Sequence, residues 1–181
     1  RGDMSLDSLL KGFVLPTWHS GGWSVAVELH FYVLFPAILW LQRGHRIGAL
    51  LALFIVSILT RFAIWSITGH VQAFSYWTIG GCIDLFLAGM LWHELSKRDI
   101  VRRHAGWLFA GSLIALVAAW HAFNLAGGFY GTTNSPLWII LPTLQGLAFG
   151  AVIVGYENAR FLLPRAADRV PRVRAANPAR A

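Results

Sequence analysis

Long apolar stretches, separated by short polar connections, run through the 181 residues of the chain. A helix that crosses a bilayer needs about 20 consecutive, mostly apolar residues. Five stretches meet this requirement, and they are residues 24–42, 47–66, 78–96, 106–123 and 136–156. They lack the strict alternation of apolar and polar residues that is typical of transmembrane barrel strands. The pattern therefore predicts an all-α fold, a polytopic transmembrane helix bundle with about five spans.

Basic residues follow the first, third and fifth predicted spans, whereas the connections 67–77 and 124–135 contain neither Lys nor Arg. Lys and Arg favour the cytoplasmic side of a membrane. The distribution therefore predicts that the N-terminal segment and these two connections face outward, and that the C-terminal end lies in the cytoplasm.

The composition supports the same class of protein. Hydrophobic residues make up 56% of the chain and charged residues only 13%, against about 25% charged residues in soluble domains. The net charge of +7 does not indicate nucleic-acid binding, because the basic residues lie between and after apolar stretches rather than on a soluble face. The single cysteine, Cys82, excludes an intrachain disulfide and a cysteine-built zinc site, and we expect no metal.

The chain divides into two regions of different composition. We expect residues 1–163 to form one membrane domain and residues 164–181 to form a basic, disordered cytoplasmic tail, since this end is rich in Arg, Ala and Pro. The chain begins with Arg1 and shows no signal-peptide layout. We therefore expect it to be the C-terminal part of a longer protein that supplies earlier spans.

Charged residues inside the predicted spans are costly, and they usually face a bundle interior or a wet cavity. At a rise of about 1.5 Å per residue, Glu28, Arg61 and Asp84 all fall roughly 6–9 Å below the outward ends of their spans. The sequence thus predicts one polar layer formed by three spans. An alternative is that Arg61 and Asp84 form an ion pair that only stabilises helix packing, or that Arg61 reaches outward to water.

The first span carries a facial pattern. Glu28 and Tyr32 are four residues apart and share one face of the helix, whereas His30 lies about 200° around it. A direct pair between Glu28 and His30 is therefore not expected, and His30 either packs or meets another span. Pro36 and Pro142 are expected to bend their spans.

Glycine spacing in the fifth span points to packing rather than to chemistry. Gly146 and Gly150 form a G-x-x-x-G pattern, which allows two helices to approach each other closely.

Two segments resemble the signature of a known family. The segment Trp23-Ser24-Val25-Ala26-Val27-Glu28-Leu29-His30-Phe31-Tyr32, followed by Leu34, Phe35 and Pro36, resembles the W-S-[LV]-x-x-E-x-x-F-Y-x-x-[FY]-P motif of the acyltransferase 3 family. The segment Asp84-Leu85-Phe86-Leu87-Ala88-Gly89-Met90-Leu91 is similar to the D-x-[LF]-x-x-G-x-[LI] segment that this family carries two spans later.

The resemblance implies an integral membrane O-acyltransferase, which we expect in a bacterial inner (plasma) membrane. Such an enzyme moves an acyl group, usually acetyl, from cytoplasmic acyl-CoA to a hydroxyl of a glycan or another cell-envelope acceptor. Acyl-CoA is then the donor substrate, and no bound cofactor is expected. The expected partners are membrane lipid, the acceptor, acyl-CoA and the preceding spans of the same protein, but no nucleic acid.

The family also has an essential histidine and an early R-x-x-R turn, which we expect to precede this chain. Arg43-Gly44-His45-Arg46 has the same spacing, but it follows the W-S motif, so its role is not carried over. His30 stands where the family often has Gln. Without the earlier histidine, residues 1–181 alone are expected to be inactive.

O-acylation needs a base for the hydroxyl proton and donors for the developing oxyanion. We expect Glu28 to be catalytic, either by orienting a histidine of the earlier spans, as the Asp of a Ser-His-Asp triad does, or by acting on the hydroxyl directly. The expected substrate-binding residues either line the acceptor or acyl channel or shape a polar chamber. They are Trp23, Ser24, His30, Tyr32, Arg61 and Asp84.

Two other functions fit parts of the pattern. A transporter or flippase subunit would use the Glu28, Arg61 and Asp84 layer to bind a solute or to relay protons. A non-catalytic assembly protein would use the face of Gly146 and Gly150 to bind a partner helix.

Overall fold

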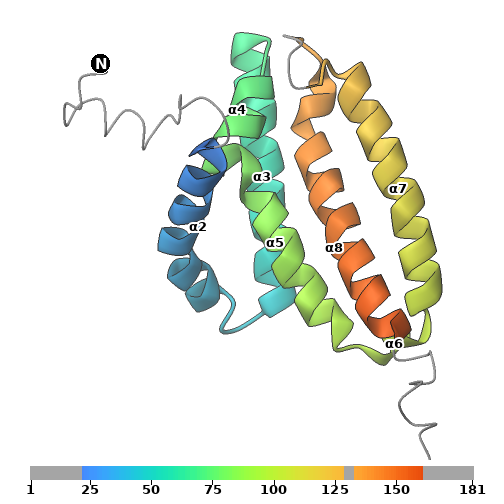
Figure 1. The fold of residues 1–181 in the computed structure, drawn as a ribbon. Coiled ribbons are helices and arrows are strands. Elements are labelled where there is room, and N and C mark those ends of the chain that lie inside the picture. The colour runs from blue at the N-terminus through green and yellow to red at the C-terminus, as the bar shows by residue number, and fades with distance from the viewer. Residues whose placement is uncertain (1–21, 129–132, 161–181) are drawn as a thin grey trace, which may run out of the picture.

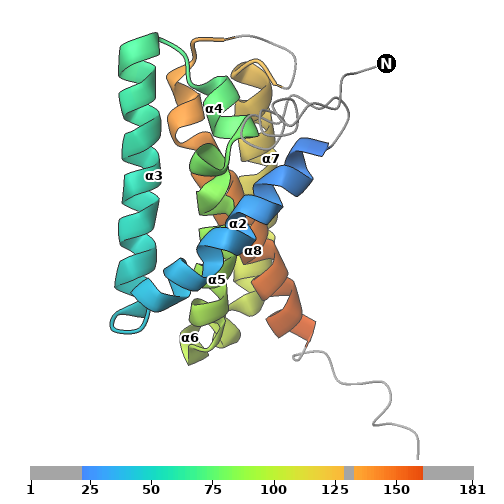
Figure 2. The same ribbon diagram turned by 90° about the vertical axis from the view of Figure 1, so that its left-hand side faces the viewer.

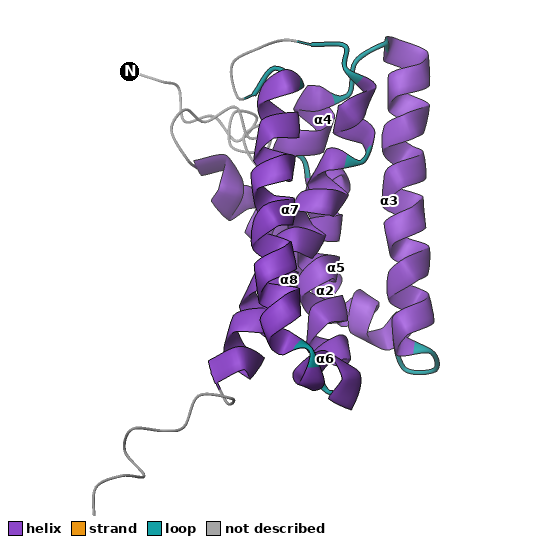
Figure 3. Cartoon of the chain, turned by 90° about the vertical axis from the view of Figure 1, so that its right-hand side faces the viewer, coloured by secondary structure: helices purple, strands orange, loops and turns teal. Residues whose placement is uncertain are grey.

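A computed structural model describes residues 22–128 and 133–160 of the chain. All regular structure in these ranges is helical, without any strand (Figure 3). The expected all-α fold is therefore confirmed. The expected tail at residues 164–181 lies outside the described residues. The helices are α2 (Gly22–Leu41), α3 (Arg46–Thr68), α4 (Gln72–Trp77), α5 (Ile79–Ser96), α6 (Asp99–Arg103), α7 (Ala105–Leu125), the 3₁₀ turn η1 (Pro136–Ile139) and α8 (Leu141–Arg160).

The five long helices overlap the five predicted stretches. Three of them, α2, α3 and α7, are long and apolar enough to cross a membrane. The other two, α5 and α8, pack against each other, and α5 also packs on α3 and α2 while α8 packs on α7 (Figure 1). Polar residues of membrane spans usually face the bundle interior, so helices in the middle of a bundle can be less apolar than those at its edge. That α5 and α8 also cross the membrane stays a prediction.

Small residues of α8 allow its close contact with α5. A Cβ atom at Gly150 would overlap the indole of Trp92, and one at Gly146 would lie 3.0 Å from the Cα of Leu85. The G-x-x-x-G pattern is therefore used for helix packing within the chain. Because α5 covers this face, it is not free to bind a partner helix, and the assembly-protein alternative loses its basis.

The two ends of the bundle differ in their connections. The start of α2, α4 and the α7–α8 connection lie at one end, whereas the α2–α3 turn and α6 lie at the other (Figures 1 and 2). The basic residues of the turns, among them Arg43, Arg46 and Lys97, thus gather at the second end. The fold agrees with the alternation of basic and uncharged connections, while the orientation in a membrane stays a prediction.

One of the two prolines does not act as expected. The fifth long helix begins at Leu141 rather than at residue 136, after the turn η1, so Pro142 lies in the first turn of α8. A proline there loses no backbone hydrogen bond and does not bend the helix. The expected bend of the fifth span at Pro142 is therefore wrong. Pro36 lies inside α2, which continues to Leu41.

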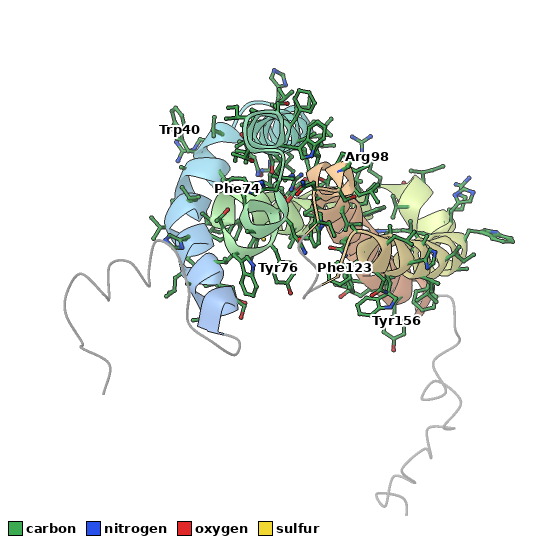
Figure 4. All side chains as sticks on the ribbon, turned by 90° about the horizontal axis from the view of Figure 1, so that it is seen from above. Trp40, Phe74, Tyr76, Arg98, Phe123 and Tyr156 are labelled. Carbon is green, nitrogen blue, oxygen red and sulfur yellow. The ribbon has the colours of Figure 1, made fainter. Side chains whose placement is uncertain are left out.

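Large apolar side chains cover the outer faces of the bundle. Ile67 is 84% exposed and Trp107 is 81% exposed, and Trp40 and Tyr156 project away from the helices (Figure 4). Contiguous apolar surface of this kind suits contact with lipid rather than with water.

Candidate functional site

A cavity of about 210 Å³, the Glu28 cavity, lies between α2, α5 and the start of α8. Its lining from α2 is Ser24, Val27 and Glu28, and from α5 it is Cys82, Leu85 and Phe86. Glu28 lines the cavity and is also exposed. Its side chain therefore lies where the cavity meets the surface. No other lining residue that the structure describes carries a charge.

Lining residues from α4, α5 and η1 have their polar groups in hydrogen bonds within the protein. The hydroxyl of Ser75 donates to the carbonyl of Trp138 (3.1 Å), and the indole N–H of Trp138 donates to the carbonyl of Ala126 (2.8 Å). The thiol of Cys82 donates to the carbonyl of Ser75 (3.2 Å). Glu28, in contrast, forms no hydrogen bond or ion pair with another residue in the described ranges. The carboxylate of Glu28 is therefore the one charged group of the described lining, and it has no internal partner.

A buried polar cluster lies behind this cavity and joins three helices. Arg61 of α3 donates to the carboxylate of Asp84 (2.7 Å), to the hydroxyl of Thr143 (2.6 Å) and to the carbonyl of Gly81 (2.8 Å). Thr143 in turn donates to Asp84. The side chains of Arg61 and Asp84 are both 0% exposed. Pairing and hydrogen bonding reduce the cost of burying two charges.

The expected polar layer is therefore only partly formed. Arg61 and Asp84 bind each other, as the packing alternative proposed, and neither lines the Glu28 cavity. The structure thus separates these two residues from Glu28, and the expected three-charge chamber does not form among the described residues. Their connection to the cavity is indirect, because Arg61 holds the carbonyl of Gly81 in the first turn of α5, next to Cys82.

The other expected substrate-binding residues lie in different places. Ser24 lines the cavity, and His30 is half-buried outside its lining. Tyr32 is 64% exposed and does not line the cavity, so its expected place along a substrate channel stays a prediction. The backbone of Trp23 is in α2, and its side chain lies outside the described part.

Sequence reasoning missed several residues of the site. Ser75 and Tyr76 come from α4, and Trp138 comes from η1, in connections where no periodic pattern predicts a position. Thr143 completes the buried cluster, yet a threonine inside an apolar stretch carries no specific signal. Gln145 also lines the cavity, and its polarity within a predicted span was the one usable indication.

A second cavity, the Arg43 cavity, lies between the C-terminal halves of α2 and α5 and has a volume of about 520 Å³. Arg43, Arg46 and Lys97 line it together with the carboxylate of Glu94. Glu94 accepts hydrogen bonds from Lys97 (2.8 Å) and Arg46 (3.2 Å). Three cations and one carboxylate leave an excess of two positive charges, so this cavity suits an anionic ligand.

Comparison with known proteins shows the family of the chain. No curated protein and no solved structure matches the chain significantly. A family model described as acyltransferase domain, that of acyltransferase 3, matches residues 3–165. The match covers most of the chain and includes both cavities and the buried cluster. Together with the apolar helices, it shows an integral membrane protein of the acyltransferase class. The chain belongs to the acyltransferase 3 family.

Proposed function

We propose that this protein transfers an acyl group from acyl-CoA to a hydroxyl of a glycan or another cell-envelope acceptor, and that this group is acetyl. We place it in a bacterial inner membrane. The end of the bundle that contains the Arg43 cavity then faces the cytoplasm, and the end that contains the Glu28 cavity faces outward. The observation that carries the proposal is the unpaired carboxylate of Glu28 at the mouth of a cavity in a chain of the acyltransferase 3 family.

The chemistry assigned to Glu28 is proton transfer. The acceptor oxygen attacks the carbonyl carbon of the thioester, so that a C–O bond forms and the C–S bond breaks. The hydroxyl proton passes to Glu28, directly or through a histidine that Glu28 orients, and then to the departing thiolate, which leaves as the free thiol. A carboxylate without an internal partner is available for this step because it loses no existing hydrogen bond.

The Arg43 cavity supports the donor side of the proposal. Acyl-CoA carries several phosphate charges, and Arg and Lys side chains are the usual binding groups for phosphates in proteins. The cavity offers Arg43, Arg46 and Lys97 at one end of the bundle, and its volume of about 520 Å³ lies within the range of about 300–1,000 Å³ typical of ligand sites. The Glu28 cavity is smaller and suits one part of a substrate, such as the acyl group.

The test uses the full-length protein in membranes with acyl-CoA labelled in the acyl group. Glu28→Gln keeps the shape of the side chain and removes its charge. It should reduce acyl transfer by about 100-fold or more, the usual range for loss of a general base, at unchanged expression. The matched control is Glu157→Gln on α8, an exposed carboxylate outside both cavities, which should keep full activity. Normal transfer by Glu28→Gln at normal expression would reject the catalytic role.

The same assay separates transfer from transport. An enzyme leaves the labelled acyl group covalently attached to a product, whereas a transporter or flippase moves an unmodified solute. The transporter alternative needs Arg61 and Asp84 to face a solute path. Both are fully buried and bonded to each other, so no observation of the described residues favours it.

A further inference from the structure

The two cavities lie along the same pair of helices. On α2, the residues of the Glu28 cavity end at Glu28, and those of the Arg43 cavity begin at Phe35. On α5, the corresponding residues are Phe86 and Gly89. At a rise of about 1.5 Å per residue, seven residues of α2 span roughly 10 Å. Only a short stretch between α2 and α5 therefore separates the two cavities.

Aromatic side chains occupy this stretch. The rings of Phe31 and Phe86 stack with their centroids 4.1 Å apart and their planes 11° from parallel. Phe31 also contacts Phe35, with ring centroids 5.5 Å apart. Because Phe86 lines the Glu28 cavity and Phe35 lines the Arg43 cavity, the three rings form a continuous series from one cavity to the other. Phe31, in the middle, is only 7% exposed.

We propose that the stacked pair of Phe31 and Phe86 is a gate between the two cavities, and that its opening lets the acyl-thioester arm of the donor pass along α2 and α5 toward Glu28. The stacked rings between the two linings are an observation of the structure, while the identity of what passes rests on the proposed function. An uncharged, linear chain fits a passage with aromatic walls, whereas the charged phosphates remain with the cations of the Arg43 cavity.

The surroundings of the pair permit such an opening. Rings stacked in contact leave no room between them, so passage needs one ring to move. Phe86 is half-buried, and an incompletely buried side chain changes its rotamer readily. On the same face of α5, a Cβ atom at Gly89 would have no heavy atom within 4 Å. The surface of α5 beside Gly89, on the side of the Arg43 cavity, is therefore open.

The test measures access to the Glu28 cavity from the Arg43 side. The starting protein is the full-length protein with Cys82→Ala and without any other cysteine. In it, Gln145→Cys places a single thiol in the lining of the Glu28 cavity. A charged, membrane-impermeant thiol reagent is added to vesicles of either orientation. A separate Lys97→Cys protein, with its thiol at the Arg43 end, identifies the orientation.

The closed pair should protect the thiol at residue 145 from reagent on the Arg43 side. Removal of either ring, in Phe31→Ala or Phe86→Ala, should raise the labelling rate from that side by about 10- to 1,000-fold, since a minor open state is typically populated at about 0.1–10%. Phe149→Ala, which removes an exposed ring of α8, is the matched control and should not change the rate. Labelling from the Glu28 side should be the same in the parent protein, Phe31→Ala and Phe149→Ala, which shows that these are folded. Because Phe86 lines the Glu28 cavity, the effect of Phe86→Ala is taken as the ratio of its labelling rates from the two sides.

Activity separates the two proposals. Phe31→Trp enlarges the barrier and should lower acyl transfer while leaving labelling from the Glu28 side unchanged. If the Phe31→Ala and Phe86→Ala proteins are labelled from the Arg43 side no faster than the parent protein, the gate is refuted, whatever their activity. If labelling rises as expected but the parent protein transfers no acyl group, the gate stands and the proposed function is wrong.

Discussion

Replacement of Asp84 by Asn tests whether the cluster of Arg61, Asp84 and Thr143 stabilises the bundle. The substitution removes one negative charge and changes the size of the side chain very little. It leaves the guanidinium of Arg61 buried at 0% exposure without its counter-ion. We expect a loss of stability rather than a change in substrate affinity, because Asp84 lines neither cavity.

The structure indicates the size of this effect. Removing one partner of a buried ion pair costs about 3–5 kcal/mol. The amide oxygen of Asn can still accept a hydrogen bond from Arg61 or Thr143, which places the expected cost near the lower end of this range. Exchanging both charges together, in Arg61→Met with Asp84→Leu, leaves no unpaired charge. The double variant should therefore lose less free energy of unfolding than Arg61→Met and Asp84→Leu lose together as single variants, with a coupling free energy of about 2–3 kcal/mol.

The free energy of unfolding is measured in mixed detergent micelles by titration with a denaturing detergent, with helix content followed by circular dichroism. Glu157→Gln on the exposed side of α8 is the control and should leave the transition unchanged. If Asp84→Asn lowers the free energy of unfolding by less than about 1 kcal/mol, the value typical of exposed ion pairs, the pair is solvated and the reasoning from burial fails.

Two further substitutions probe helix packing and donor binding. Gly150→Ala should destabilise the protein by about 1–3 kcal/mol, the usual cost of overpacking, because its Cβ atom would overlap Trp92. The control is Gly111→Ala on α7, where nothing lies within 4 Å, and it should be neutral or stabilise by up to about 1 kcal/mol. Equal effects of the two substitutions in the same titration would refute the packing argument. Arg43→Ala and Lys97→Ala should each raise the KM for acyl-CoA about tenfold, as expected for loss of a hydrogen bond to a charged group, without changing the KM for the acceptor. Steady-state kinetics with each substrate varied in turn measures both KM values. An equal rise in the two values would contradict a donor site.

The buried cluster shows where prediction from the pattern stops. The positions of Arg61 and Asp84 in their spans predicted similar depth, and an ion pair between them was one of the alternatives. Their separation from Glu28 was not predictable, because depth along a helix says nothing about the direction in which a side chain points around it. Thr143 joins them only because α8 packs on α5 at the register that Gly146 and Gly150 allow.

The sequence by itself determined that the chain is helical, where its long helices lie and which carboxylate carries the family motif. Apolar runs of sufficient length predict helices in a membrane because only helices and closed barrels satisfy the backbone there. Tertiary structure alone decided which faces meet. Helices that are apolar nearly all round do not indicate their inner face, since lipid and protein interiors are similarly apolar. Close packing at small residues and the pairing of buried polar groups select the faces instead, and these contacts produced both cavities and the ring pair of Phe31 and Phe86 between them.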